Sequence, residues 1–332
     1  MKIDIHNHYY PKAFIKELEK GVVPNLQIIR DEVGRNIIIH KGTRVVTITP
    51  PMNDVDLRIN DMKETGIDMQ VLSLSVPSVD VFPPEEGILF ARMVNEELSK
   101  ICKLYPNQFA FLATIPLKAK EKAIQELEYA VTKLGAKGVI LGSNIDGEPL
   151  DKQDFRPFFA KVPELDIPIL IHPMTPAGNE SMNDYRLAPM IGFEMDLCLA
   201  TVRIIMSGLL KDFPNLKFII SHLGGAIPYL TERIENCFQA YPECKINIQD
   251  SPKNYLSKIY FDTVSFHAPA LMCAYAFPGP SRMVLGSDYP HVIGDIRRAV
   301  TTINELPISE VHKEMILGGN LINLLKLDRL ER

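Results

Sequence analysis

The first eight residues, Met1-Lys2-Ile3-Asp4-Ile5-His6-Asn7-His8, form a short apolar stretch that ends in His-x-His. Ile3 and Ile5 give it the period of a β-strand, and no turn residue interrupts it before His8. Residues two apart on a strand point to the same side, so the two imidazoles are expected to project together. Two neutral imidazoles can share a divalent metal, but an isolated His-x-His is more often a polar strand end. The rest of the chain must decide between these interpretations.

Composition restricts the class of protein. With 332 residues, 46% of them hydrophobic, the chain can form one large barrel or two ordinary domains. Its formal charge of -5, with both signs interspersed, predicts neither a nucleic-acid partner nor a membrane partner. No apolar signal region or membrane-length run is present, so we expect a cytoplasmic protein. The five cysteines are scattered and have no Cys-x-x-Cys spacing, which indicates reduced thiols.

Strand-like runs alternate with helical patterns along the whole chain. After the first strand, we expect strands at 68–75, 109–115, 138–141, 167–171, 216–220, 259–262 and 283–285. Helices are expected between them, for example at 54–65, 155–165 and 193–210. Such alternation implies parallel pairing, and eight strands predict a closed (β/α)₈ barrel, the TIM-barrel form of the α/β class. An open doubly wound sheet is the alternative, but no Gly-x-Gly-x-x-Gly or P-loop follows any strand.

One segment departs from this alternation. Residues 26–48 contain short β-branched runs separated by Gly34-Arg35-Asn36 and Lys41-Gly42, which predicts a small antiparallel insertion after the first strand and helix. No repeat, low-complexity tract or long linker divides the chain. We therefore expect residues 1–332 to form a single barrel domain that carries this insertion.

Metal-ligand residues stand where the expected strands end. The fifth strand runs into His172, the sixth into His222 and the eighth into Asp288. Parallel barrel strands deliver their C-terminal ends to one mouth, where catalytic groups gather. Each residue alone has an ordinary explanation, such as a core histidine or a loop turn. Together, four of the eight histidines and an aspartate are predicted at one mouth; His267 and His291 are weaker pocket candidates.

These motifs resemble those of the amidohydrolase superfamily, in particular the branch of aminocarboxymuconate semialdehyde decarboxylase and related nonoxidative aromatic-acid decarboxylases. The matching stretches are His6-x-His8, His172-Pro173, Ser221-His222-Leu223-Gly224-Gly225 and Gly286-Ser287-Asp288-Tyr289-Pro290. The resemblance implies His6, His8, His172 and Asp288 as metal ligands and His222 as the acid/base. The proton that reaches the carbon could come from either His222 or Asp288, and the sequence does not rank them.

The resemblance also bears on the metal. Binuclear superfamily members use a modified lysine at the end of strand four, where this chain has Leu141-Gly142-Ser143, so one metal is expected. Three imidazoles and a carboxylate are consistent with zinc and leave manganese open. Such a metal can polarise a substrate oxygen.

Two arginines match substrate-binding positions of this branch. Arg44 lies in the insertion, and Arg233 matches an arginine that reaches the neighbouring subunit's site, which implies a homodimer. The planar guanidinium suits carboxylates, although both arginines could equally be solvated surface residues. Tyr185 and Arg186, in the 182–192 segment, are further possible pocket contacts.

The expected function is metal-dependent nonoxidative decarboxylation of a small carboxylated aromatic or muconate-like substrate. Metal-dependent hydrolysis of an amide or lactone is the alternative within enzymes, because the same centre could activate water. A noncatalytic metal-binding barrel is a third and weaker interpretation.

Overall fold

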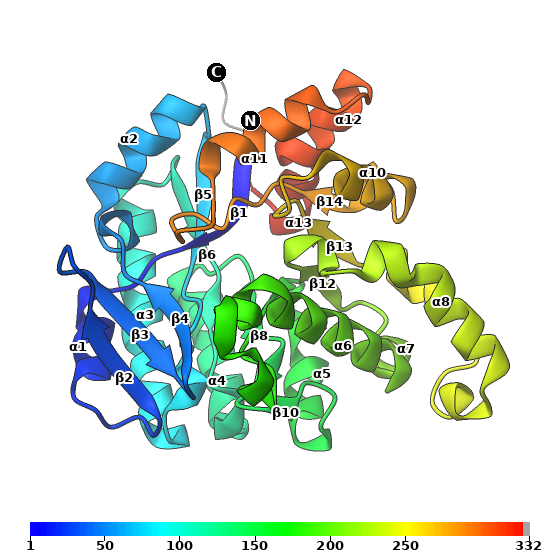
Figure 1. The fold of residues 1–332 in the computed structure, drawn as a ribbon, viewed down its shortest axis with the longest axis horizontal. Helices are drawn as coiled ribbons and strands as arrows, with labels where there is room; N and C mark the ends of the chain where they lie inside the picture. Colours follow the sequence, from blue (N-terminus) through cyan, green and yellow to red (C-terminus); the bar gives the residue numbers. More distant parts are fainter. Residues whose placement is uncertain (328–332) are drawn as a thin grey trace.

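Eight parallel strand positions close into a ring in the computed structural model, which describes residues 1–327 (Figure 1). In ring order the strands are β1 (Ile3–His8), β5 (Met69–Ser73), β6 (Phe109–Phe111) continued by β7 (Ala113–Thr114), β8 (Val139–Gly142), β11 (Pro168–His172), β12 (Lys217–Ile220), β13 (Tyr260–Asp262) and β14 (Met283–Val284). The ring closes where Ile5 N donates to Leu285 O over 3.0 Å and Asn7 bridges Tyr289 in parallel. The predicted (β/α)₈ barrel is confirmed.

Helices surround the ring and follow the strands in order. The longer ones are α2 (Val55–Thr65), α3 (Pro84–Leu104), α4 (Glu121–Tyr129), α5 (Arg156–Leu165), α6 (Phe193–Met206), α8 (Ile227–Ala240), α10 (Ala268–Ala276) and α11 (Ile296–Glu305). Shorter helices are α1 (Lys12–Glu19), α7 (Leu209–Asp212), α9 (Pro252–Leu256), α12 (Glu310–Glu314) and α13 (Asn320–Leu325). Helix α8 projects outward from the barrel (Figure 1). Within residues 1–327, no helix is long and apolar enough to span a membrane.

The structure divides two elements that the sequence predicts as continuous, one strand and one helix. The single strand expected at 109–115 is split, because Leu112 N still donates to Leu72 O on one neighbour while Ala113 N donates to Gly138 O beside the other neighbour. The strand therefore bends from one neighbour to the next, as a closed barrel requires. The helix expected at 193–210 ends at Met206, because Gly208 takes a left-handed conformation with φ 79° before α7 begins.

A three-stranded antiparallel sheet lies in the segment where the sequence predicts an insertion. It consists of β2 (Leu26–Arg30), β3 (Asn36–His40) and β4 (Thr43–Thr47), in the order β2-β3-β4. Figure 1 shows it beside the barrel, next to α1. Its last strand carries Arg44.

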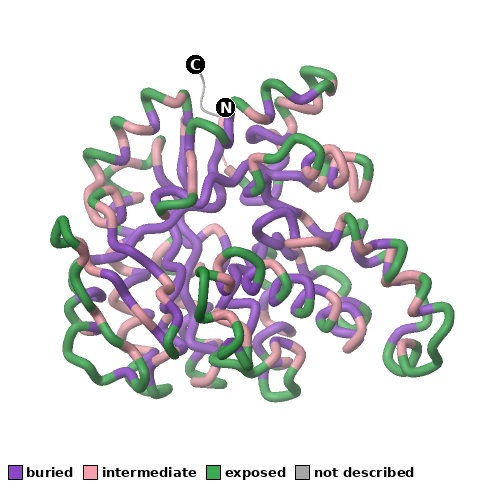
Figure 2. Tube along the Cα trace, viewed as in Figure 1, coloured by how far each residue is buried: buried purple, intermediate pink, exposed green. Residues whose placement is uncertain are grey.

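Apolar side chains fill the ring at the N-terminal end of the strands. Ile3, Ile5, Val71, Leu170 and Ile219 belong to one buried cluster, against which α13 packs Leu321, Leu324 and Leu325. Buried positions are concentrated in the strands, and exposed positions lie at the periphery (Figure 2). Polar ligand-type residues are therefore confined to the other end of the strands.

A bulge in β1 separates these two levels. The pairing of β1 with β5 changes register between Asp4 and Asn7. Simple alternation would place His6 on the opposite side from Ile5, yet Ile5 lies in the interior cluster and His6 lies close to His172 and His222. The extra residue allows both Ile5 and His6 to face the interior.

Candidate metal centre and active site

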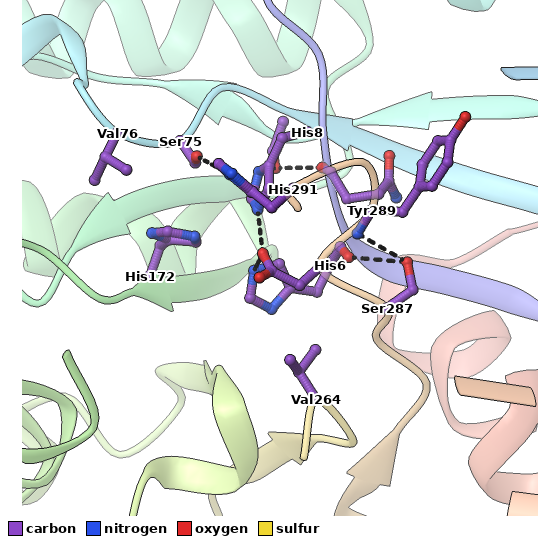
Figure 3. Close-up of polar contacts among 12 residues, drawn as sticks. His6, His8, Ser75, Val76, His172, Val264, Ser287, Tyr289 and His291 are labelled. Carbon is purple, nitrogen blue, oxygen red and sulfur yellow. Dashed lines mark hydrogen bonds and ion pairs between the residues drawn. The ribbon is translucent and has the colours of Figure 1, made fainter. Parts of the chain in front are cut away.

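Four histidines and one aspartate meet at the C-terminal mouth of the barrel. Figure 3 shows three of these histidines, His6, His8 and His172. We call them the imidazole cluster: His6, His8, His172, His222 and Asp288. The ring of His6 lies 4.9 Å from that of His8, 5.1 Å from that of His172 and 5.2 Å from that of His222, measured between centroids. All five residues are at most 9% exposed. The structure thus brings together the strand-end residues that the sequence singled out.

Hydrogen bonds to the outer nitrogens determine how three of these rings are protonated. His6 Nδ1 donates to the Asp262 carboxylate over 2.6 Å, and His172 Nδ1 donates to the Pro173 carbonyl over 2.9 Å. The Ser73 hydroxyl donates to the Asn7 carbonyl, so His8 Nδ1, 3.2 Å away, must donate to the Ser73 oxygen. A neutral ring with its proton on Nδ1 carries its lone pair on Nε2.

The Nε2 atoms of His6, His8, His172 and His222 are buried, and none has a hydrogen-bond partner among the described residues. Asp288 Oδ1 lies 3.4 Å from His6 Nε2 and 3.3 Å from His8 Nε2. Buried polar atoms normally have partners, so several unpartnered lone pairs beside a carboxylate need an explanation. A divalent cation between them supplies one, and three imidazoles with a carboxylate suit zinc or manganese.

The pKa values of these groups have two physical causes. Burial lowers the pKa of His8 and of His172 well below the ordinary value, so both rings are neutral. Burial also opposes charge on His6, but the Asp262 carboxylate outweighs it and raises the pKa of His6 to about 10. Burial favours protonation of Asp288, yet the neighbouring histidines hold its pKa well below the usual range. A cation bound here would displace the extra His6 proton.

His222 has a different outer partner. Its Nδ1 lies 2.7 Å from a carboxylate oxygen of Glu194, in the first turn of α6. Although burial opposes the charged ring, this carboxylate raises the pKa of His222. Gly225 has φ 62° and allows this close approach, because a Cβ there would lie 2.2 Å from the Glu194 carbonyl oxygen. Within the imidazole cluster, His222 therefore combines a raised pKa with a position on the wall of a cavity, as a proton donor requires.

A cavity of about 460 Å³ opens onto the cluster. Its wall includes His172, His222, Asp288, Arg44 and Arg186, together with apolar side chains such as Val76, Phe193 and Ile293. The two guanidiniums have no ion-pair partner within residues 1–327. A larger hollow of about 650 Å³ lies between α1 and α3, but no histidine lines it.

Of the remaining predicted residues, one lines the cavity and three do not. Arg233 is exposed on α8 and does not line the cavity of its own chain. Tyr185 is 85% exposed, so the expectation that it contacts the pocket was wrong for this chain on its own. His267 is exposed at the start of α10, whereas His291 lines the cavity.

Sequence reasoning missed the outer partners. Asp262 closes β13 just as the ligand-type residues close their strands, so its position could have indicated a role. Glu194 gave no such signal, because it lies inside an apolar helix and 28 positions before His222. Only the fold brings Glu194 and His222 together.

A closed parallel barrel with imidazoles and a carboxylate at its C-terminal mouth defines a class, the metal-dependent TIM-barrel enzymes. The comparisons with known proteins narrow this class. The sequence profile of the amidohydrolase family matches residues 3–327. This chain belongs to the amidohydrolase family.

Its relatives include several decarboxylases. The 2-amino-3-carboxymuconate-6-semialdehyde decarboxylase of Dictyostelium discoideum is 30% identical, over 99% of this chain and 92% of that protein. The gamma-resorcylate decarboxylase of Rhodococcus jostii is 30% identical, over 82% of this chain and 88% of that protein. A solved dihydroxybenzoic acid decarboxylase from Polaromonas, with bound manganese and the inhibitor 2-nitroresorcinol, is 25% identical and has a TM-score of 0.84, over 99% of this chain and 97% of that one.

Proposed function

We propose that this protein is a metal-dependent nonoxidative decarboxylase that removes carbon dioxide from a small carboxylated aromatic or muconate-like acid. The observation that carries the proposal is the set of Nε2 atoms of His6, His8 and His172 that have no partner among the described residues. They lie beside Asp288, next to a cavity that His172, Asp288 and two arginines line. His6, His8, His172 and Asp288 would hold one divalent ion. The donor set favours zinc, while the manganese of the Polaromonas structure makes manganese the second candidate.

The chain's own residues divide the remaining work. Arg44 binds the substrate carboxylate through its planar guanidinium, and the apolar wall keeps water away. The metal, when bound, supplies positive charge next to the substrate oxygen and so stabilises charge that develops during the reaction. The bond between the ring carbon and the carboxylate breaks, carbon dioxide leaves, and the electron pair stays on the carbon.

A proton must then reach that carbon. His222 and Asp288 are the two candidates, since both line the cavity. The Glu194 carboxylate raises the pKa of His222, whereas the pKa of Asp288 lies well below its usual range. Burial opposes both shifts, because it lowers the pKa of His222 and raises that of Asp288, but the charged neighbours outweigh it. Of the two groups, His222 therefore binds a proton more tightly. We therefore assign proton donation to His222.

The active unit is proposed to be a homodimer. Arg233 is exposed on α8, which projects away from the barrel of its own chain (Figure 1). From there it can complete the cavity of a second copy, as the matching arginine does in this branch of the family. Mixing an Arg233→Ala chain with a His222→Ala chain tests this assignment, because dimers that combine one intact Arg233 with one intact His222 should recover activity.

The direct test of the proposed reaction is carbon dioxide release from the metal-loaded protein. The panel should contain hydroxybenzoates, carboxyvanillates and aminocarboxymuconates, with amides and lactones as the comparison set. Release from at least one acid, without hydrolysis of the comparison set, is the expected result. Hydrolysis without carbon dioxide release would mean that the protein is a hydrolase and not a decarboxylase. Inactivity on both sets would favour a noncatalytic barrel.

Arg44→Ala tests the carboxylate contact. We expect KM to rise about tenfold with a smaller change in kcat, because the guanidinium binds the carboxylate in both ground and transition states. Arg30→Ala is the matched control, since Arg30 is exposed on the same inserted sheet. An unchanged KM in Arg44→Ala would make Arg44 a surface residue of the insertion.

A further inference from the structure

His291 lines the cavity but has no role in the proposed reaction. It follows Asp288 by three residues, and its ring centroid lies 5.0 Å from that of His8 (Figure 3). One ligand-type atom of each of His8, Asp288 and His291 lies within 4.8 Å of the others. A substrate held at the metal centre would therefore place its neighbouring substituents next to this ring.

The hydrogen bonds behind His291 can be assigned donor by donor. The Tyr10 hydroxyl donates to the Val76 carbonyl over 2.8 Å, which uses its only hydrogen. The Ser75 hydroxyl, 2.8 Å from the Tyr10 oxygen, must then donate to that oxygen. Ser75 has no second hydrogen, so His291 Nε2, at 3.1 Å, must donate to Ser75. The neutral ring consequently carries its lone pair on Nδ1.

Nothing in the described protein uses this lone pair. His291 Nδ1 makes no hydrogen bond within residues 1–327, and it is absent from the buried atoms that lack partners, so it is accessible to solvent. The ring is also part of the cavity wall. The protein thus presents a fixed hydrogen-bond acceptor beside the metal centre.

We infer that His291 Nδ1 accepts a hydrogen bond from a hydroxyl or amino group next to the substrate's reacting carboxylate, and so selects acids that carry this donor. The inference rests on the proposed function and specifies its substrate class. A hydroxyl that loses its partner in a buried site is strongly disfavoured, so one such acceptor can discriminate substrates effectively. The competing role for His291 is that of an additional metal ligand.

Two substitutions distinguish the roles of the two ring nitrogens of His291. His291→Asn places its amide oxygen near the position of Nδ1 but cannot reach Ser75, whereas His291→Gln places its amide near the position of Nε2 and keeps the contact with Ser75. The probes are 2-nitroresorcinol, which has a hydroxyl on each side of the nitro group, and 2-nitrophenol, which has one. The metal would take one hydroxyl of either probe, so only 2-nitroresorcinol would have a second hydroxyl left to donate to His291. The Kd of each probe is measured by calorimetry on metal-loaded wild type and both variants, and metal content is measured in parallel.

Wild type and His291→Asn should prefer 2-nitroresorcinol by about tenfold, and His291→Gln should lose this preference while keeping its metal. A preference that survives in His291→Gln and disappears in His291→Asn would overturn the inference, because the contact with Ser75 would then matter. Loss of metal from either variant would overturn it in favour of a metal ligand. If wild type binds neither probe, the proposed substrate class itself fails, and the inference fails with it.

Discussion

Both faces of β1 bury polar side chains, but the two faces differ in whether these side chains have hydrogen-bond partners. The interior face supplies His6 and His8 to the imidazole cluster, where the Nε2 atoms have no partner in the described protein. The outer face supplies Asp4 and Asn7 to a second group, which we call the Arg58 network. Its members are Asp4, Asn7, Arg58, Gln70 and Ser287.

The Arg58 network is almost completely paired. Arg58 Nη1 donates to Asn7 Oδ1 over 3.0 Å and to Gln70 Oε1 over 2.7 Å, and Nη2 donates to the His8 carbonyl. Asp4 accepts from the Ser287 hydroxyl over 2.6 Å. Among the described atoms of this network only Arg58 Nε lacks a partner. A buried polar network whose hydrogen bonds are made within the protein stabilises the fold. A group in which several lone pairs face one point is suited to binding a ligand.

The largest expected effect comes from His172→Ala, which removes one ligand of the imidazole cluster. We expect decarboxylation to fall about 10⁴-fold and bound metal to fall well below that of wild type, because the centre loses an imidazole. The free energy of unfolding of the metal-free protein should change little by comparison. Elemental analysis, carbon dioxide release and urea unfolding check the three parts.

His267→Ala is the matched control for this variant, since His267 is exposed and lies outside the cavity wall. It should retain metal and activity. Full metal content in His172→Ala would remove His172 from the ligand set and weaken the contrast between the two faces of β1.

Arg58→Met should mainly lower the stability of the fold, in contrast to His172→Ala, which mainly lowers bound metal and activity. It leaves Asn7 Oδ1, Gln70 Oε1 and the His8 carbonyl without their donor, so the free energy of unfolding should fall by about 3–5 kcal/mol. Urea denaturation measures this change, with Arg30→Met on the exposed surface of β2 as the control. A variant that folds as stably as wild type would show that the network is not structural.

Asp80 is a third case for this comparison. Its Oδ1 is also buried without a hydrogen-bond partner among residues 1–327, but Asp80 does not line the cavity. Burial raises the pKa of Asp80 from 3.8 to about 7. Between these values the folded chain retains a proton that the unfolded chain has released, so stability is lost as pH rises toward 7. From pH 5 to pH 8, Asp80→Asn should gain about 2–3 kcal/mol in unfolding free energy relative to wild type.

Urea unfolding at the two pH values measures this difference, and metal content should stay at the wild-type level. A stability difference that does not change with pH would mean that Asp80 ionises normally. Metal loss would mean that a single unpartnered atom outside the cavity wall also contributes to metal binding.

Glu194→Gln should give the smallest effect. The amide still accepts from His222 Nδ1 but no longer carries the charge that raises the pKa of that ring. We expect activity to fall about 10–100-fold with metal retained, and the pH profile of kcat to shift to lower pH. An unchanged pH profile would assign Glu194 a purely structural role.

The sequence predicted the features that depend on local pattern. Strand and helix periods predicted the barrel, and the residues at strand ends predicted the meeting of His6, His172 and Asp288. These predictions succeed because all parallel strands of a barrel point the same way, so the position of a residue along its strand determines the end at which it lies.

The features it did not predict depend on tertiary contacts. The bulge that turns His6 inward beside Ile5 follows from how β1 pairs with β5, and no residue pattern marks it. Glu194 reaches His222 only because α6 packs beside the loop at Gly225. The tautomer of His291 follows from a chain of hydrogen bonds through Ser75. In each case the information lies in the spatial neighbours of the residue.

The most direct test of the account is a crystal structure of the purified protein with anomalous data collected at the metal absorption edges. We predict one strong peak per chain, about 2.0–2.3 Å from Nε2 of His6, His8 and His172 and from a carboxylate oxygen of Asp288, with His222 outside the bonding distance. No peak, or a peak bound by His222 in place of His172, would contradict the account.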